Sequence, residues 1–165
     1  TLDSVQGGLN DILAELIGLG ETTVLEAVAG ETNTGIGRIA FLEESVSLEA
    51  LIDRVKQALG LTLARYSGDE GKTITKVAVI TGSGQSFFSH AASAGAECII
   101  TGDTTYHHVS DLREEGIAVI DAGHFGTEWP ALKVFSKWFQ NRISGMGFEN
   151  SVVLAESVSC PYKYR

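Results

Sequence analysis

The chain has 165 residues, of which 44% are hydrophobic and 20% are charged, a balance that is typical of one globular domain and excludes disordered, collagen-like and coiled-coil classes. Twelve Lys and Arg stand against 21 Asp and Glu, which gives a net charge of −9. A surface this acidic repels phosphate backbones, so nucleic acid is not an expected partner, although a bound metal or a ring of cations reverses the field locally.

The N-terminal part of the chain is expected to form two helices and an antiparallel pair of strands. Apolar residues recur at helical spacing from Leu9 to Ile17, and Gly18 ends that pattern. Two runs rich in β-branched residues, 22–29 and 35–43, flank a Gly-Glu-Thr-Asn-Thr turn and predict the strand pair. A second apolar stripe runs over 48–59, between the favoured N-cap Ser47 and Gly60.

From Leu61 onward, strands and helices alternate, and this alternation predicts parallel βαβ units with right-handed crossovers. The expected fold class is therefore α/β, with a mixed, largely parallel sheet, flanking helices, βαβ units in the C-terminal half and the antiparallel pair near the N-terminus. The expected strands are 61–66, 77–81, 98–101, 118–121 and 151–156, and the expected helices are 86–94, 106–115 and 127–143.

The two cysteines and the lengths of the apolar segments indicate the expected cellular location. Cys98 and Cys160 make no disulfide framework and no secretory signal is seen, so a cytoplasmic location is expected. No stretch approaches the roughly 20 apolar residues of a membrane helix, so no membrane partner is expected. The chain also begins without Met, from which an N-terminal part of the protein is expected to be missing.

Candidate functional residues follow the strands of the C-terminal half, because ligands of parallel sheets bind at the carboxyl ends of the strands. His124 and Glu128 are four residues apart at the entrance of a helix, where Pro130 is expected in the first turn. An imidazole and a carboxylate at this spacing are able to bind one divalent ion. The alternative is a loop histidine and an acid favoured by the helix dipole.

Two further loops carry candidates. His107, with Asp103 one turn earlier, is a candidate ligand or proton donor, and the alternative is a solvent-exposed histidine. The segment Gly-Ser-Gly-Gln-Ser at 82–86 joins a strand to a helix, so its backbone N–H groups are candidates for holding an anion, with Gly82, Ser83, Gly84 and Ser86 in that role. The alternative is a tight turn that Ser86 caps; the segment matches neither a Walker motif nor the dinucleotide fingerprint.

Two long strings carry a family resemblance: Ile-Ile-Thr-Gly-Asp-Thr-Thr-Tyr-His at 99–107 and Val-Ile-Asp-Ala-Gly-His-Phe-Gly-Thr-Glu at 119–128. Shorter agreements are Thr-Leu-Asp at 1–3, Gly-Ile-Gly-Arg-Ile at 35–39 and Val-Ile-Thr-Gly-Ser-Gly at 79–84. In this order and over its whole length, the chain resembles the Ngg-interacting-factor-three-like family, whose members are also called type-two GTP cyclohydrolase-like proteins.

The resemblance implies a site for two divalent metal ions, such as Zn, Fe or Mn, inside an α/β fold. The family's ligands are a His pair from an N-terminal segment, the Asp of the Thr-x-Leu-Asp segment, and the His and Glu of Gly-His-x-x-x-Glu. The last three correspond to Asp3, His124 and Glu128, whereas the His pair has no counterpart here. Residues 1–165 are therefore expected to be the C-terminal two-thirds of a single dinuclear-metal domain, without the ferredoxin-like domain that larger members insert.

Two functions remain open on this resemblance. One is a metal-dependent hydrolase of a small molecule, a nucleotide or related heterocycle, with GTP ring opening as the activity that the family name implies; His107 and Asp103 would then protonate a leaving group or orient the substrate. The other is a metal-binding regulatory or scaffolding protein without robust turnover. The resemblance also implies a ring-shaped homo-oligomer, expected to be a hexamer, with its interface near the His124 helix or the 22–43 hairpin.

Overall fold

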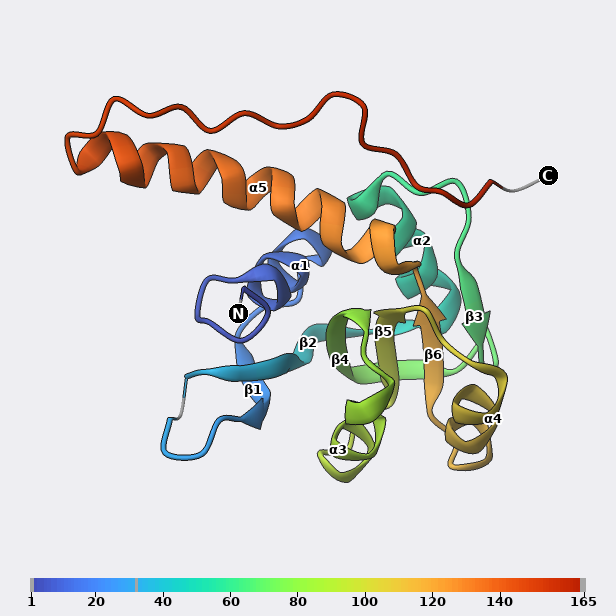
Figure 1. Cartoon of the computed structure of the whole chain (residues 1–165). Helices are drawn as coiled ribbons and strands as arrows, with labels where there is room; N and C mark the ends of the chain where they lie inside the picture. Colours follow the sequence, from blue (N-terminus) through green and yellow to red (C-terminus); the bar gives the residue numbers. More distant parts are fainter. Residues whose placement is uncertain (1, 32, 164–165) are drawn as a thin grey trace.

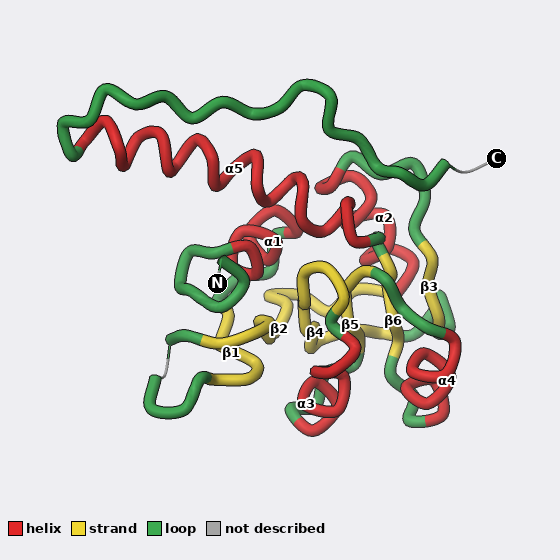
Figure 2. The backbone as a smooth tube through the Cα atoms, viewed as in Figure 1, coloured by secondary structure: helices red, strands yellow, loops and turns green. Residues whose placement is uncertain are grey.

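One mixed sheet organises the part of the chain that the structure describes, residues 2–31 and 33–163 of a computed structural model (Figures 1 and 2). Its strand order is β1-β2-β4-β5-β6-β3. The strands are β1 (Thr22–Ala27), β2 (Gly35–Ser47), β3 (Arg65–Ser67), β4 (Thr73–Ser83), β5 (Cys98–Gly102) and β6 (Ala118–Asp121). The helices are α1 (Leu9–Ile17), α2 (Leu48–Leu59), the short 3-10 helix η1 (Gln85–Phe87), α3 (Phe88–Ser93), α4 (Tyr106–Glu114) and α5 (His124–Gly145).

Helices cover both faces of the sheet. Figure 1 shows α1, α2 and α5 on one face and α3 and α4 on the other. Alternation along the strands supplies both cores, because successive side chains of a strand point to opposite faces. Val77 and Val79 of β4 belong to the core under α1 and α2, whereas Ala78 and Ile80 belong to the core under α3 and α4. The sheet is therefore buried on both sides in its centre, as a βαβ arrangement requires.

The expected mixed sheet is confirmed, with its parallel pairings confined to β4, β5 and β6. The antiparallel pair of β1 and β2 is also confirmed, although Thr32 of its predicted turn lies outside the described residues. The helix ends agree as well. Ser47 caps α2 by accepting a hydrogen bond from the Ala50 N–H at 3.1 Å, and Gly18 and Gly60 end α1 and α2 in the left-handed conformation.

Three expected boundaries are wrong in ways that change how the chain folds, and β2 and β4 are also longer than the expected 35–43 and 77–81. The strand expected over 61–66 is shortened to β3, which pairs antiparallel with β6 and not in parallel. Because β3 occupies the free edge of β6, the expected strand 151–156 has no edge to pair with there. This segment belongs instead to an irregular tail that runs back beside α5, where Gln140 accepts a hydrogen bond from the Val152 N–H at 2.6 Å (Figure 1).

The third wrong boundary is the start of the last helix. The sequence predicts a start near Thr127 with Pro130 in the first turn, but α5 begins at His124 and contains Pro130 in its interior. Gly123 precedes it with a φ of +76°, a conformation that favours glycine. The Thr127 hydroxyl accepts a hydrogen bond from the Gly82 N–H at 2.9 Å and therefore ties α5 to β4. This early start places His124 on the helix itself.

No helix within the described ranges has both the length and the apolar character that a membrane crossing requires. The longest, α5, carries polar and charged residues along its length. Its second half and the first part of the tail form an arm that extends away from the sheet, and the rest of the tail returns toward α2 and β3 (Figure 2).

Candidate metal and substrate site

The loops that follow β5 and β6 lie in direct contact at the carboxyl edge of the sheet. A side-chain carbon added to Gly102, the last residue of β5, would lie 2.5 Å from the Gly123 carbonyl carbon and 2.6 Å from the His124 nitrogen. Only a glycine at 102 permits this approach, since real side-chain carbons do not come so close to backbone atoms. The start of α5 is therefore pressed against the residues that follow β5.

His124 stands between two carboxylates. Its Nδ1 lies 2.7 Å from Asp103 Oδ2, and its Nε2 lies 3.1 Å from Glu128 Oε1, one turn further along α5. Asp103 reaches this position with a φ of +53°, the single positive value among the described residues other than glycine. The ring is 47% exposed. The site thus presents an imidazole between two oxygen donors and remains open to solvent.

Asp3 approaches the same edge from the N-terminal loop. Its Oδ1 accepts a hydrogen bond from the Thr81 hydroxyl at 3.4 Å, and its backbone carbonyl accepts one from the Asn10 side-chain amide at 2.9 Å. Asn10 is fully buried, and its own carbonyl oxygen accepts a hydrogen bond from the Thr81 N–H at 2.9 Å. The loop before α1 is thereby fixed to the end of β4.

The charges of this group act on one another. Burial raises the pKa of Glu128, and the negative charges of Asp3 and Asp103 raise it further, whereas the adjacent His124 opposes the shift. The direction is that expected for a carboxyl that is partly removed from water and surrounded by other carboxylates. Asp3, Asp103 and Glu128 therefore share one electrostatic environment around His124, and a cation placed among them would relieve their repulsion.

Gly82 lies directly against the side chains of His124 and Glu128. A side-chain carbon at this position would lie 2.5 Å from Glu128 Oε1 and 3.2 Å from His124 Nε2, and the residue has a φ of +63°. Its N–H is already donated to Thr127, and its carbonyl accepts a hydrogen bond from the Thr101 hydroxyl at 3.2 Å. A glycine is needed at position 82 because any side chain there would overlap with the side chains of Glu128 and His124.

The neighbouring glycine also has a steric reason. A side-chain carbon at Gly84 would lie 2.5 Å from Ile80 and 2.9 Å from the Thr101 hydroxyl. Ser83 still belongs to β4, and Ser86 lies within η1. An anion held by Gly82, Ser83, Gly84 and Ser86 stays a prediction, and the Gly82 N–H is not available for it.

His107 and Asp103 do not form the expected pair. Asp103 contacts His124 instead of His107. Because Asp103 precedes α4, it does not share a helical turn with His107. His107 is exposed, and its ring meets the edge of Tyr106 with 5.5 Å between centroids. His108 turns the other way, toward Phe88 and the Thr105 hydroxyl. Asp103 therefore lies beside His124, the histidine proposed to bind metal. The role predicted for His107 stays a prediction.

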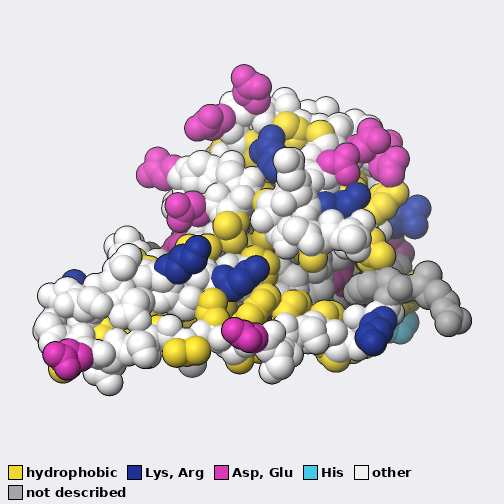
Figure 3. All heavy atoms as spheres, turned by 90° about the horizontal axis from the view of Figure 1, so that it is seen from above, with side chains coloured by type: hydrophobic (Ala, Val, Ile, Leu, Met, Phe, Trp, Pro, Cys, Tyr) yellow, Lys and Arg dark blue, Asp and Glu magenta, His cyan; other side chains and the backbone are white. Residues whose placement is uncertain are grey.

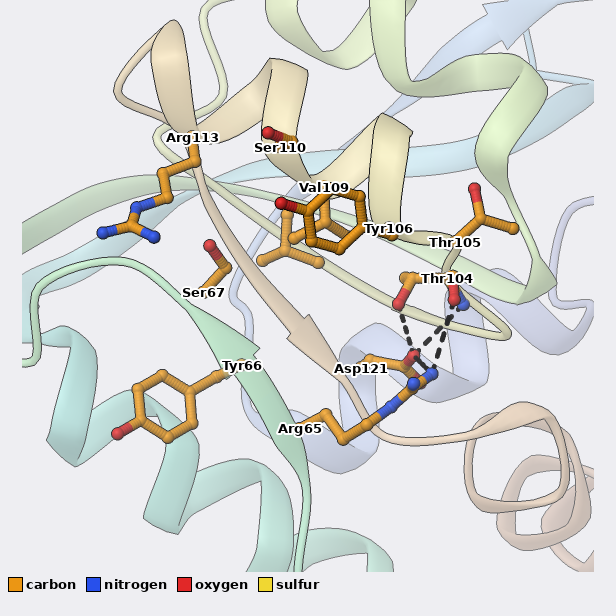
Figure 4. Close-up of a pocket in the computed structure, with 11 residues that line it drawn as sticks. Arg65, Tyr66, Ser67, Thr104, Thr105, Tyr106, Val109, Ser110, Arg113 and Asp121 are labelled. Atoms are coloured by element: carbon orange, nitrogen blue, oxygen red, sulfur yellow. Dashed lines mark hydrogen bonds and ion pairs between the residues drawn. The ribbon is translucent and has the colours of Figure 1, made fainter.

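Asp121 is a site residue that sequence reasoning did not assign. It is 5% exposed and ends β6, where its Oδ1 accepts a hydrogen bond from the Gly123 N–H at 2.9 Å. Its Oδ2 accepts hydrogen bonds from the N–H and hydroxyl of Thr104 and pairs with Arg65 (Figure 4). Burial opposes ionisation, but these donors and the Arg65 charge outweigh it and lower the pKa of Asp121. One carboxylate therefore fixes the turns that present Asp103 and His124.

The types of donor at this edge suit a divalent ion, since imidazole and carboxylate are ligands of Zn, Fe and Mn. Asp103 on Nδ1 is placed as an outer carboxylate that orients the ring and leaves Nε2 facing the site. Over residues 2–31 and 33–163, however, no three His, Cys, Asp or Glu side chains are arranged as a complete metal-binding group. The described residues thus fit part of a metal site and do not complete one.

Comparison with known proteins gives consistent relatives. A family model described as Duf34/NIF3 (NGG1p interacting factor 3) matches residues 1–161. The chain is 45% identical over 165 residues to a Clostridium acetobutylicum protein named GTP cyclohydrolase 1 type 2 homolog, covering 99% of this chain and 62% of that protein. A Clostridium perfringens protein of the same name is 38% identical, with 98% of this chain and 61% of that protein covered. The chain thus spans about three-fifths of the length of these relatives.

Solved structures agree in fold. The Bacillus cereus protein related to NIF3 superposes with a TM-score of 0.91 at 19% identity, covering 99% of this chain and 71% of that one. Reduced HcgD from Methanocaldococcus jannaschii superposes with a TM-score of 0.67 at 29% identity, covering 85% of this chain and 54% of that one. At 19% identity, the first similarity speaks for the fold alone.

Proposed function

Because the chain belongs to the Duf34/NIF3 family, we propose that it carries part of the active site of a metal-dependent hydrolase that acts on a nucleotide or a related heterocycle. The observation that carries this proposal is His124, held between Asp103 and Glu128 beside Asp3 at the open carboxyl edge of the sheet. The name of the relatives, GTP cyclohydrolase 1 type 2 homolog, supports a nucleotide as the substrate class.

Asp3, His124 and Glu128 are the residues of this chain that would hold two divalent ions, together with ligands from elsewhere in the complete site. The chemistry that such ions supply when bound is a lower pKa for water, which makes hydroxide available near neutral pH. Asp103 accepts the Nδ1 proton of His124 and so directs Nε2 toward the site.

A scaffolding or regulatory protein is the second candidate, and the exposed arm formed by α5 and the tail favours it. Trp138 and Phe139 are 57% and 42% exposed, although aromatic side chains of this size are usually buried. Metal analysis and a substrate screen on the full-length protein separate the two functions. Metal-dependent turnover of a nucleotide supports the hydrolase, and bound metal without turnover favours the scaffold.

We also propose that the protein forms a ring-shaped homo-oligomer, with a hexamer as the expected size. Figure 3 shows scattered hydrophobic side chains along the arm at the left and more in the middle of the view, and most of the acidic side chains lie in its upper part. The strand β1 is an edge of the sheet, and an unpaired edge is a further surface for a second copy. The residues of the arm with exposed apolar side chains are Val134, Trp138, Phe139, Met146, Phe148 and Val153.

Light scattering on the full-length protein at micromolar concentration is expected to give a mass well above that of a monomer. Trp138→Asp is expected to lower this mass if the α5 arm forms the interface, because it places a charge in a desolvated contact. Phe41→Asp on β2, where the side chain is 64% exposed, is expected to lower it if the hairpin does. A monomeric parent protein contradicts the proposal.

A cytoplasmic location is proposed on the cysteines. Both are free thiols, and Cys98 lies fully buried in the core, where burial raises its pKa to about 12. A buried thiol of this kind is inert and packs as a small apolar residue. Free thiols are typical of reducing compartments.

Gly82→Ala tests the contact of Gly82 with His124 and Glu128. The added methyl group is expected to displace Glu128 from His124 and to lower metal affinity at least about tenfold, as loss of a supporting contact does. Gly60→Ala is the matched control, because Gly60 has a similar φ of +69° and open space around it. Both variants are expected to lose roughly 1 to 2 kcal/mol of stability to the left-handed backbone. Equal metal affinities in the two variants would show that Gly82 has no role beyond its backbone conformation.

A further inference from the structure

A cavity of about 370 Å³ opens between β3, α4 and β6 (Figure 4). It adjoins the candidate metal site through two of its lining residues, Thr104 and Asp121. Thr104 and Asp121 form the boundary between the two, since Thr104 follows Asp103 in sequence and Asp121 holds the turn that leads to His124. Its volume lies in the range of cavities that hold small molecules. The residues that give the cavity its chemistry are Arg65, Ser67, Tyr106, Ser110, Arg113 and Asp121.

Two arginines line this cavity in a protein whose net charge is −9. Arg65 comes from β3 and is partly neutralised by Asp121. Arg113 comes from the last turn of α4 and is exposed, and its guanidinium makes no hydrogen bond or ion pair with any residue in the described part of the chain. The acidic protein thus places an uncompensated guanidinium at one cavity, where it attracts an anion.

Hydroxyl groups and one aromatic ring complete the lining. Ser67 and Ser110, from β3 and α4, have side-chain hydroxyls without hydrogen-bond partners among residues 2–31 and 33–163. The Tyr106 ring is 81% exposed at the first turn of α4, and Figure 4 shows it over the cavity. Val109 and Val119 add apolar surface. Donors for an anion and a face for a planar ring therefore line the same space.

We propose that this cavity binds the phosphate ester of an aromatic ring compound, with Arg113, Ser67 and Ser110 holding the phosphate and Tyr106 stacking on the ring. A guanidinium with two hydroxyl donors supplies more hydrogen bonds than a carboxylate needs and suits the three terminal oxygens of a phosphate. A stacked ring gains a further contribution from the tyrosine face. The inference rests on the proposed function and deepens it, because it assigns the phosphate of the proposed nucleotide substrate an anchor apart from the metal site.

The geometry also sets the size of the ligand. Arg113 lies near the far end of α4, a helix of nine residues, and Thr104 lies just before its start. A ligand that reaches both must span roughly the 13 Å length of such a helix. A phosphate anchored at Arg113 therefore leaves the other end of a nucleotide-sized molecule beside Asp103 and His124.

The test measures binding of GMP, guanosine and inorganic phosphate to the full-length protein by isothermal titration calorimetry. Arg113→Gln is expected to weaken GMP binding at least tenfold and to leave guanosine binding unchanged. Arg142→Gln is the matched control, because Arg142 is also an exposed arginine in the last turn of a helix. Tyr106→Leu is expected to weaken GMP and guanosine by the same factor, and Tyr106→Phe is expected to restore both.

Two results overturn the inference: GMP affinity that is equal in Arg113→Gln and the parent, or a parent protein that does not bind GMP at millimolar concentration. The outcome is separable from that of the proposed hydrolase. If Arg113→Gln loses GMP binding while the parent shows no metal-dependent turnover, the cavity is a phosphate-ester site and the hydrolase proposal fails. If turnover depends on His124 while Arg113→Gln binds GMP as tightly as the parent protein, the hydrolase proposal holds and the cavity inference fails.

Discussion

Replacing His124 with Ala is expected to remove metal from the full-length protein and to lower nucleotide hydrolysis at least about a hundredfold. Among the described residues proposed as ligands, His124 supplies the nitrogen donor, and both neighbouring carboxylates point at it. The fold is expected to survive, because the side chain is 47% exposed and belongs to none of the hydrophobic cores. Elemental analysis gives the metal content, and circular dichroism checks the fold.

His90→Ala provides the control for this substitution. His90 lies on α3, its side chain is 43% exposed, and its Nε2 is 3.1 Å from a carboxylate oxygen of Glu26. Similar exposure and a carboxylate at Nε2 are thus shared with His124, which differs in its place in the fold and in a second carboxylate, that of Asp103, at Nδ1. Unchanged metal stoichiometry in His124→Ala, or an equal loss in His90→Ala, contradicts the assignment of His124 as a ligand.

The sequence predicted the location of this site in the sheet, but it did not predict which of the site residues contact one another. Apolar strands alternating with helices identified the segments after β4, β5 and β6, and Gly82, Asp103 and His124 do meet there. The contact of Asp103 with His124 was not predictable from spacing. It joins residues 21 apart and depends on a left-handed turn at Asp103 that Asp121 holds in place. Local pattern carries no information on such a contact.

The errors in the last third of the chain have a common physical origin, which is competition for partners. The last helix was expected to begin near Thr127, but the Thr127 hydroxyl accepts a hydrogen bond from the Gly82 N–H on another element. The 151–156 segment has the composition of a strand, but β3 already pairs with β6. In each case the competing partner is remote in sequence.

Asp3 depends on a buried ion pair that lies away from the metal site. Arg38 of β2 is 2% exposed and uses all five of its N–H donors. Its Nε and Nη2 pair with the Asp11 carboxylate, and its remaining donors reach the carbonyls of Val5, Gly35 and Gly37. Val5 belongs to the loop that carries Asp3. Arg38 and Asp11 therefore connect the strand β2, the start of α1 and the N-terminal loop.

Arg38→Met is expected to lower the free energy of unfolding by about 3 to 5 kcal/mol, because it removes the cation that pairs with the Asp11 carboxylate and the guanidinium donors that reach three carbonyls. This is a large share of the roughly 5 to 15 kcal/mol that stabilises a domain of this kind. Urea unfolding measures the loss, and Arg142→Met, at an exposed arginine, is expected to change stability by less than about 0.5 kcal/mol.

A double variant separates the ion pair from simple packing. Arg38→Met together with Asp11→Leu is expected to recover part of the lost stability, because removing both partners leaves no unpaired charge near the core. Metal affinity is expected to fall in Arg38→Met and to stay low in the double variant. In both variants the N-terminal loop that carries Asp3 lacks the hydrogen bond from Arg38 to the Val5 carbonyl. A loss below about 1 kcal/mol in Arg38→Met, or a double variant less stable than the single one, would show that the pair does not hold this loop.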